Sequence, residues 1–96
     1  MLDIKNHTQE QEALLEDLLA ELVSDAQLVV YNDDQNTFDW VIECFMDVLQ
    51  HSSTQAEQLA MMIHFKGKAT VKTAPKEILK PMKSALTDRG LSVVIE

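Results

Sequence analysis

The fold is decided by an apolar run that passes directly into a polar one, Leu28-Val29-Val30-Tyr31-Asn32-Asp33-Asp34-Gln35. Four apolar residues followed by turn-forming residues predict a short, buried strand. A helical pattern begins soon afterwards, near Phe38. The polar residues are therefore expected in a strand-to-helix turn, where loop side chains on a rigid scaffold commonly meet a ligand.

Two amphipathic helices are expected after this turn. The first covers residues 37–50, with a cap at Asn36 or Thr37 and an apolar stripe at helical spacing, Phe38, Val41, Ile42, Phe45 and Leu49. The second is expected to begin at a capping box formed by Thr54 and Glu57. It should stop at Gly67.

The remaining sequence predicts strands at residues 68–72 and 91–95, with one helix between them. Pro75 suits the first helical position, and Gly90 suits the left-handed conformation after the helix. Pro81 has no N–H to donate, so a kink or a late helix start is expected there. The order strand, helix, helix, strand, helix, strand predicts an α+β domain: three helices packed on a three-stranded antiparallel sheet.

Residues 1–26 form an acidic, leucine-rich tail before the domain of residues 27–96. The tail has seven acidic residues and one basic residue. Its aliphatic residues recur on one face of a helix: Leu14, Leu15, Leu18, Leu19, Leu22 and Val23. We expect a helix-prone extension that docks loosely or frays, although six exposed aliphatic side chains are unusual without a partner.

The composition narrows the class of protein. Ninety-six residues, 46% of them hydrophobic, suffice for one domain with one core. The net charge of -8 argues against nucleic acid, because duplex affinity rests largely on basic side chains at phosphates. The sequence shows no membrane span and no secretory signal, and the single Cys44 cannot form an internal disulfide. We expect a reduced, cytoplasmic, monomeric protein.

The charges are divided along the chain. Residues 1–57 carry 13 acidic residues and one basic residue, whereas residues 58–96 carry seven basic and three acidic residues. This division predicts two differently charged faces.

A second polar group interrupts apolar sequence at His64, in Met61-Met62-Ile63-His64-Phe65. A protonated α-amine has three donors and no acceptor, so Asn32, Asp33 and His64 together would complement it. Apolar walls beside them suit a hydrophobic group, so a free peptide N-terminus is a fitting ligand. No nucleophile has a visible activating base, and Cys44 lies in an apolar helical stripe. The sequence thus predicts a non-enzymatic binding protein with no metal and no cofactor.

Three stretches resemble the ClpS adaptor family: Asn32-Asp33-Asp34, the helix from Phe38 to Val48, and Ile63-His64-Phe65-Lys66-Gly67-Lys68. The resemblance covers residues 27–96. It implies an adaptor that presents N-degron substrates, those beginning with Leu, Phe, Tyr or Trp, to the N-terminal domain of a ClpA- or ClpC-type ATPase. It also implies that the segment before the domain helps to hand over the substrate.

The resemblance assigns roles to single residues. Asn32 and Asp33 would hold the substrate α-amino group directly, His64 would do so through water, and Asp34 would lie near the pocket. The pocket itself would be lined by Asn36, Phe38, Val41, Ala60 and Ile63. Glu77 would contact the ATPase.

This chain departs from the family pattern at four places. Phe38 stands where Met is usual, Ala60 where a bulky residue is usual, and Thr37 where Pro is frequent. The stretch from Glu77 to Met82 matches poorly to the Ala-Glu-Thr-Lys motif of many members. We therefore expect an altered ranking of bulky first side chains.

Three other interpretations remain open. Asn32-Asp33-Asp34 is also typical of plain turn and capping chemistry. Asn32, Asp34, Asn36 and Glu43 occupy positions 1, 3, 5 and 12 of a calcium loop, although Thr37 stands where that loop requires glycine. The third interpretation is an interaction or oligomerisation module of the same fold without degron binding.

Overall fold

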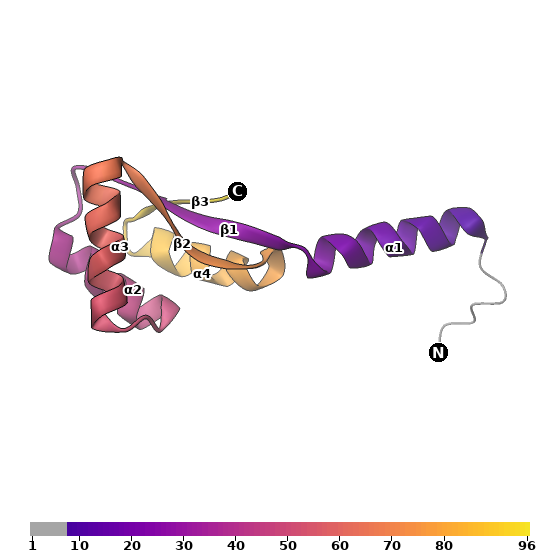
Figure 1. Cartoon of the computed structure of the whole chain (residues 1–96), viewed down its shortest axis with the longest axis horizontal. Helices are drawn as coiled ribbons and strands as arrows, with labels where there is room; N and C mark the ends of the chain where they lie inside the picture. The colour runs from indigo at the N-terminus through magenta and orange to yellow at the C-terminus, as the bar shows by residue number, and fades with distance from the viewer. Residues whose placement is uncertain (1–7) are drawn as a thin grey trace.

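A computed structural model describes residues 8–96, apart from the side chains of Glu21 and Leu22. Its elements, in chain order, are α1 (Gln9–Val23), β1 (Asp25–Tyr31), α2 (Phe38–Leu49), α3 (Ser53–Lys66), β2 (Lys68–Pro75), α4 (Lys76–Asp88) and β3 (Ser92–Ile95). Figure 1 shows α2, α3 and α4 gathered beside the sheet, while α1 extends away from them at the N-terminal end of β1.

The sheet has three antiparallel strands in the order β2-β1-β3. Leu28 pairs with Lys72, but its neighbour Val29 pairs with Thr70, so Val71 is an extra residue on β2. This β-bulge places one irregularity in the middle of an edge strand. The expected α+β class, the antiparallel sheet and the order β-α-α-β-α-β are confirmed, and an N-terminal helix precedes them.

The core lies between the sheet and the three helices. Alternate residues of the central strand, Leu28 and Val30, point to the same side, as the pleat of a strand requires. There they meet Phe45 of α2 together with Leu79 and Leu86 of α4, all fully buried. These contacts fix the sheet against the helices, and so fix the β1–α2 loop at one edge of the core.

The helix starts differ in part from expectation. Thr37 caps α2, accepting a hydrogen bond from the Trp40 N–H, as predicted. The predicted capping box of Thr54 and Glu57 is wrong: α3 begins at Ser53, and Ser52 is the cap. The sequence offers three consecutive hydroxyl residues here. The first of them is the cap, because the chain has already turned at Gln50, which adopts the left-handed conformation after α2.

The two prolines of the fourth helix also behave differently from expectation. Pro75 ends β2 and precedes the helix, which begins at Lys76. Pro81 neither delays nor divides α4, which continues through it to Asp88. Pro81 deprives only the carbonyl of Glu77 of its helical bond, and Glu77 lies in an exposed first turn where water can replace it.

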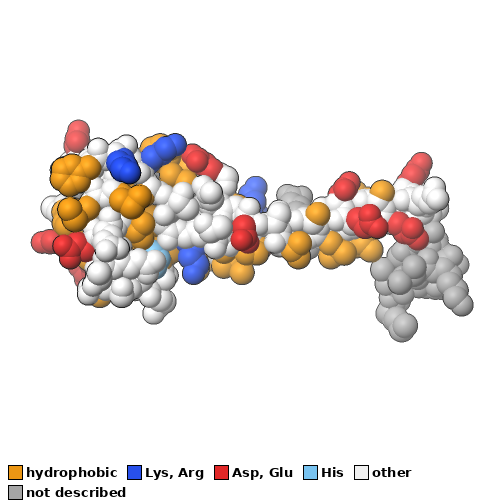
Figure 2. All heavy atoms as spheres, in the orientation of Figure 1, with side chains coloured by type: hydrophobic (Ala, Val, Ile, Leu, Met, Phe, Trp, Pro, Cys, Tyr) orange, Lys and Arg blue, Asp and Glu red, His pale blue; other side chains and the backbone are white. Residues whose placement is uncertain are grey.

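The described side chains of helix α1 are all exposed. Thr8 and Gln11 form a reciprocal capping box at its start. Leu14 is 61% exposed and Val23 72% exposed, and Figure 2 shows hydrophobic side chains along one side of the helix with acidic ones beside them. Residues 9–23 of the predicted extension are therefore helical, with an apolar face that meets little of the domain, and residues 1–7 of that extension lie outside the described part of the chain. In residues 8–96, no helix has the length and apolar character to cross a bilayer.

Candidate functional site

The loop between β1 and α2 is organised around the carboxylate of Asp33. Its Oδ1 atom accepts hydrogen bonds from the backbone N–H groups of Gln35 and Asn36, at 2.9 and 3.0 Å. The Asn36 amide donates to both carboxylate oxygens, at 2.9 and 3.0 Å. The Ser92 hydroxyl donates to Oδ2 from the start of β3, at 3.1 Å. Asp33 thus fixes the turn that the sequence predicted.

These bonds also set the charge of the carboxylate. Burial alone raises the pKa of Asp33, but the hydrogen bonds from Asn36, Gln35 and Ser92 outweigh it and hold the pKa below its usual value. Asp33 is therefore a firmly ionised group at neutral pH. The β1–α2 loop therefore carries a fixed negative charge at Asp33.

The same loop is tied to the turn between α4 and β3. The Asn36 amide donates to the carbonyl of Gly90 at 2.9 Å, and the Trp40 indole N–H donates to the carbonyl of Arg89 at 3.0 Å. Gly90 has a φ of 92°, the left-handed conformation predicted for it. The turn at Arg89 and Gly90 thus anchors both the β1–α2 loop and the first turn of α2.

A small pocket of about 50 Å³ lies beside this loop and brings together most of the predicted site residues. Asn32 and Asn36 come from the loop, and His64 comes from the last turn of α3. The other lining residues are apolar: Phe38, Val41, Ala60 and Ile63. We call it the loop pocket. The loop pocket therefore combines polar side chains from the β1–α2 loop and from α3 with apolar walls.

An adjoining hollow of about 20 Å³ extends the loop pocket toward the sheet. It shares Asn32, Asn36, Val41 and Ile63 with the loop pocket, and adds Asp33. It also adds Leu91, just before β3, which the sequence could not identify as a site residue. Leu91 was visible only as an inward-facing residue of the last strand, and nothing in its spacing showed which cavity it would reach.

Two predicted site residues lie elsewhere. Asp34 is exposed on the loop and lines neither hollow. Glu77 lies in the first turn of α4, where it forms an exposed ion pair with Lys80 at 3.0 Å. Neither placement tests the role assigned to these residues, which stay predictions.

His64 has both ring nitrogens available. Its imidazole packs edge-on against the exposed ring of Phe65, with centroids 5.0 Å apart. Within residues 8–96 no hydrogen bond engages the His64 side chain, so a neutral imidazole there can offer one donor and one acceptor to a ligand.

The calcium interpretation fails on geometry. A calcium loop needs a sharp turn at its sixth position and a backbone carbonyl turned to the ion at its seventh, but Thr37 at the sixth position caps α2, and α2 already begins at Phe38, the seventh. Glu43 therefore lies on a regular helix, away from the Asn32 turn. Among the described residues, no group of three or more acidic, His or Cys side chains is arranged to hold a metal ion.

Comparison with known proteins identifies the family of the chain. A family model described as ATP-dependent Clp protease adaptor protein ClpS matches residues 23–94. The chain belongs to the ClpS family. The ClpS adapter of Thermosynechococcus vestitus is 32% identical to it over 68 residues, which are 70% of this chain and 72% of that protein. The family resemblance seen in the sequence is confirmed.

A solved ClpS structure shares the fold. The structure of Agrobacterium tumefaciens ClpS2 bound to L-phenylalaninamide matches with a TM-score of 0.73 and 22% sequence identity. The match covers 76% of this chain and 95% of that one. As a ClpS-family member, the protein is an adaptor of the Clp protease, which makes a Clp ATPase its class of partner.

The environment of Cys44, the one cysteine of the sequence, is that of a structural thiol. Cys44 is fully buried in the core. Burial raises the pKa of its thiol, opposed by the charge of Arg89. A protonated, enclosed thiol is a poor nucleophile.

Proposed function

We propose that the chain is a non-catalytic adaptor that binds N-degron substrates through the loop pocket and delivers them to a Clp ATPase. The observation that carries the proposal is the loop pocket itself, where Asn32 and His64 stand at the edge of an apolar cavity. A substrate N-terminus combines the two matching features, a charged amine and a hydrophobic side chain. The L-phenylalaninamide bound to the Agrobacterium protein has the same two features, which supports the assignment.

The family resemblance implies direct contact with the α-amine by Asn32 and Asp33 and contact through water by His64. Asn32 keeps its direct role in our proposal, and His64 becomes the second direct partner. The Asn32 carbonyl oxygen and an unprotonated imidazole nitrogen are acceptors, which is what a three-donor ammonium group needs. Asp33 has a different proposed role. Its oxygens already accept bonds from Gln35, Asn36 and Ser92, so it would attract the ammonium group by charge and hold the loop in place.

The walls of the loop pocket would receive the first side chain. About 50 Å³ has room for only a few water molecules, so a Leu or aromatic side chain requires the cavity to widen. Phe38, 40% exposed at the start of α2, is the wall residue best able to move. Ala60, nearly buried on α3, leaves depth that a longer side chain would fill. We therefore propose that Leu, Phe, Tyr and Trp are accepted and that stiff, β-branched Ile and Val are rejected.

The energies are consistent with moderate affinity. Burying a Leu or Phe side chain contributes about 1.5–3 kcal/mol. Each charge-assisted hydrogen bond contributes a further 1.5–3 kcal/mol or so. After the cost of association, binding on the order of micromolar is expected.

Calorimetry with short peptides tests the binding proposal. A peptide that begins with a free Leu or Phe should bind, and the same peptide with an acetylated N-terminus should not, because acetylation removes the charge and the donors. A peptide with the same Leu at an internal position is the matched control. Equal affinity for free and acetylated peptides would remove the α-amine from the site.

The exposed apolar face of α1 favours a second candidate, an interaction or oligomerisation module of the same fold without degron binding. The same titration separates the two functions, because only the adaptor distinguishes a free N-terminal Leu from an internal one. If the chain is the adaptor, we propose that α1 takes part in handing over the substrate. Glu77 of α4 would then contact the N-terminal domain of a ClpA- or ClpC-type ATPase.

A further inference from the structure

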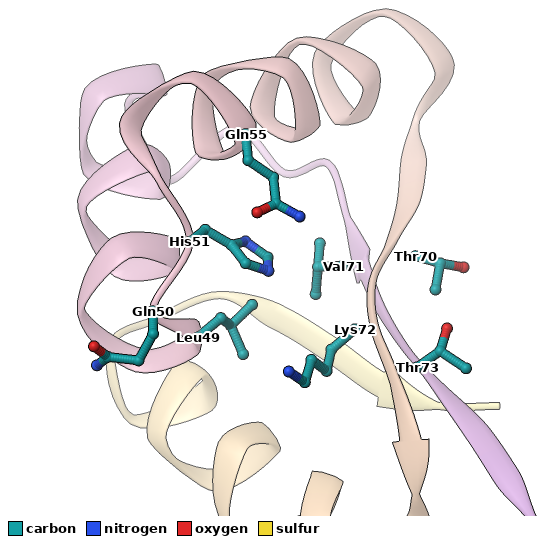
Figure 3. A pocket seen from close by; sticks show the side chains of 8 residues that line it. All are labelled: Leu49, Gln50, His51, Gln55, Thr70, Val71, Lys72 and Thr73. Atoms are coloured by element: carbon teal, nitrogen blue, oxygen red, sulfur yellow. The ribbon is translucent and has the colours of Figure 1, made fainter.

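A second cavity, separate from the loop pocket, lies between the edge strand β2 and the turn that joins α2 to α3. Its volume is about 530 Å³, against about 50 Å³ for the loop pocket, and the two share no lining residue. The residues that line it are Leu49, Gln50, His51, Gln55, Thr70, Val71, Lys72 and Thr73. We call it the edge pocket, and Figure 3 shows it from close by.

The edge pocket is a consequence of strand geometry. Successive side chains of a strand point to opposite faces, so four consecutive residues of β2 can line one cavity only along the edge of the strand. That edge is free because β2 is an outer strand whose other side pairs with β1. The extra residue of the bulge, Val71, lies within this stretch. Such bulges often redirect a side chain beside a binding site.

The lining of the edge pocket is polar and carries no acidic residue. It combines a lysine, a histidine, two glutamines and two threonines with only Leu49 and Val71. This is unusual in a chain whose net charge is -8. Lys72 and His51 line the same cavity, and besides burial the positive charge of Lys72 lowers the pKa of the imidazole. The local charge is therefore opposite in sign to that of the whole molecule.

Among the described residues that line this cavity, His51 carries a buried polar atom without a hydrogen-bond partner. Its imidazole meets Phe45 of α2 edge-on, with centroids 6.2 Å apart. In Figure 3 the imidazole and the Gln55 carboxamide of α3 extend into the same space, with Lys72 of β2 opposite. The Nδ1 atom is buried and has no hydrogen-bond partner within the described residues. A buried polar atom without a partner is uncommon and is often explained by an ordered water or ion beside it.

We propose that the edge pocket binds an anionic group, a carboxylate or a phosphate, through the Lys72 ammonium group, the His51 imidazole and the Gln55 amide. The lysine supplies the opposite charge, and the imidazole and amide supply N–H donors from a second and a third direction. The α3 helix starts beside the cavity, so its positive end adds to the attraction. This site is independent of degron binding, because it uses none of the residues of the loop pocket.

Nuclear magnetic resonance titration of the full chain tests the proposal. Inorganic phosphate and acetate are added in separate arms at constant ionic strength, with sodium chloride as the reference salt. We expect saturable shifts confined to residues 49–55 and 70–73, with half-saturation at about 1–10 mM, the range of a small anion held by a few contacts. Saturation by phosphate alone identifies a phosphate site, and saturation by acetate as well identifies a site for carboxylates. No saturable shift with either anion overturns the proposal.

Two lysine variants show whether the response is specific. Lys72→Met removes the ammonium group and keeps the length of the side chain, and should weaken anion binding at least about fivefold, as for a lost charge-assisted contact. Lys68→Met is the matched control on the same strand, because Lys68 lies over the Tyr31 ring, 5.6 Å from its centroid, outside the edge pocket. It should change the affinity less than twofold. Equal weakening by both variants would reduce the effect to general charge attraction and overturn the proposal.

The imidazole gives a second readout. Burial lowers the pKa of His51, and the charge of Lys72 lowers it as well. An anion bound beside the ring must raise that pKa, because it favours the protonated imidazole. The groups that face His51 are Lys72 of β2, Gln55 of α3 and Phe45 of α2. A His51 titration curve that phosphate and acetate leave in place would contradict binding at this position.

Discussion

Replacing Asp33 with alanine should destabilise the domain, because this carboxylate joins the β1–α2 loop to the start of β3. The substitution deprives four donors of their acceptor: the N–H groups of Gln35 and Asn36, the Asn36 amide and the Ser92 hydroxyl. Each such bond contributes about 0.5–1.5 kcal/mol net. Water can replace part of this at a half-exposed site, so we expect a loss of about 2 kcal/mol.

Urea unfolding followed by circular dichroism measures this loss. The urea midpoint should fall while the slope of the free energy against urea concentration stays unchanged. In a thermal melt, a loss of about 2 kcal/mol should lower the Tm by roughly 8–16 °C. Asp34→Ala is the matched control, because that neighbouring carboxylate is exposed and should change the free energy of unfolding by less than about 0.5 kcal/mol. Equal unfolding midpoints for the two variants would refute the reasoning and reduce the Asp33 bonds to incidental contacts.

Three further predictions address the pocket, the tail and pH. Ala60→Met fills the depth of the loop pocket, so peptides beginning with Trp should lose affinity relative to those beginning with Leu; an unchanged ranking in calorimetry would show that position 60 does not meet the side chain. A chain that starts at Asp25 should fold and bind degron peptides within about twofold of the full chain, yet should not accelerate degradation of an N-degron reporter by a Clp protease. Unfolding of that shortened chain would assign the α1 leucines to the core. Because the pKa of His51 in the fold lies below 6.5, the unfolded chain binds the proton more readily, so stability should decline as the pH drops below about 6.5. His51→Gln should lessen that decline between pH 7 and 5, and an identical pH dependence in the two proteins would contradict it.

Much of the fold could be predicted from periodicity alone. The apolar run at Leu28 to Tyr31 became the central strand, and the helical stripe from Phe38 became α2. The errors are local and have local causes. Adjacent hydroxyl residues compete to cap a helix, so Ser52 could replace Thr54 without changing the pattern of the helix. Pro81 looked disruptive because the sequence does not show that the carbonyl it deprives belongs to an exposed turn.

The candidate site was less accessible to prediction than the fold. Spacing and family resemblance suggested that Asn32 and His64 belong together, and the structure places both at one small pocket. The sequence could not reveal the hydrogen bond between the Asn36 amide and the carbonyl of Gly90, because these residues are 54 positions apart. Nor could it indicate the edge pocket, because His51 and Lys72 belong to separate elements, 21 residues apart, that meet only in the folded domain.

The projecting helix α1 has a consequence for measuring the size of this protein in solution. The radius of gyration is 17.8 Å and the longest dimension is 57 Å, whereas a compact domain of this length has a radius of gyration of about 12.5 Å. A compact particle of twice the mass would reach only about 16 Å. One elongated copy should therefore elute from a sizing column where a globular dimer is expected. Light scattering or sedimentation equilibrium, which report mass rather than drag, are the measurements that distinguish one copy from two.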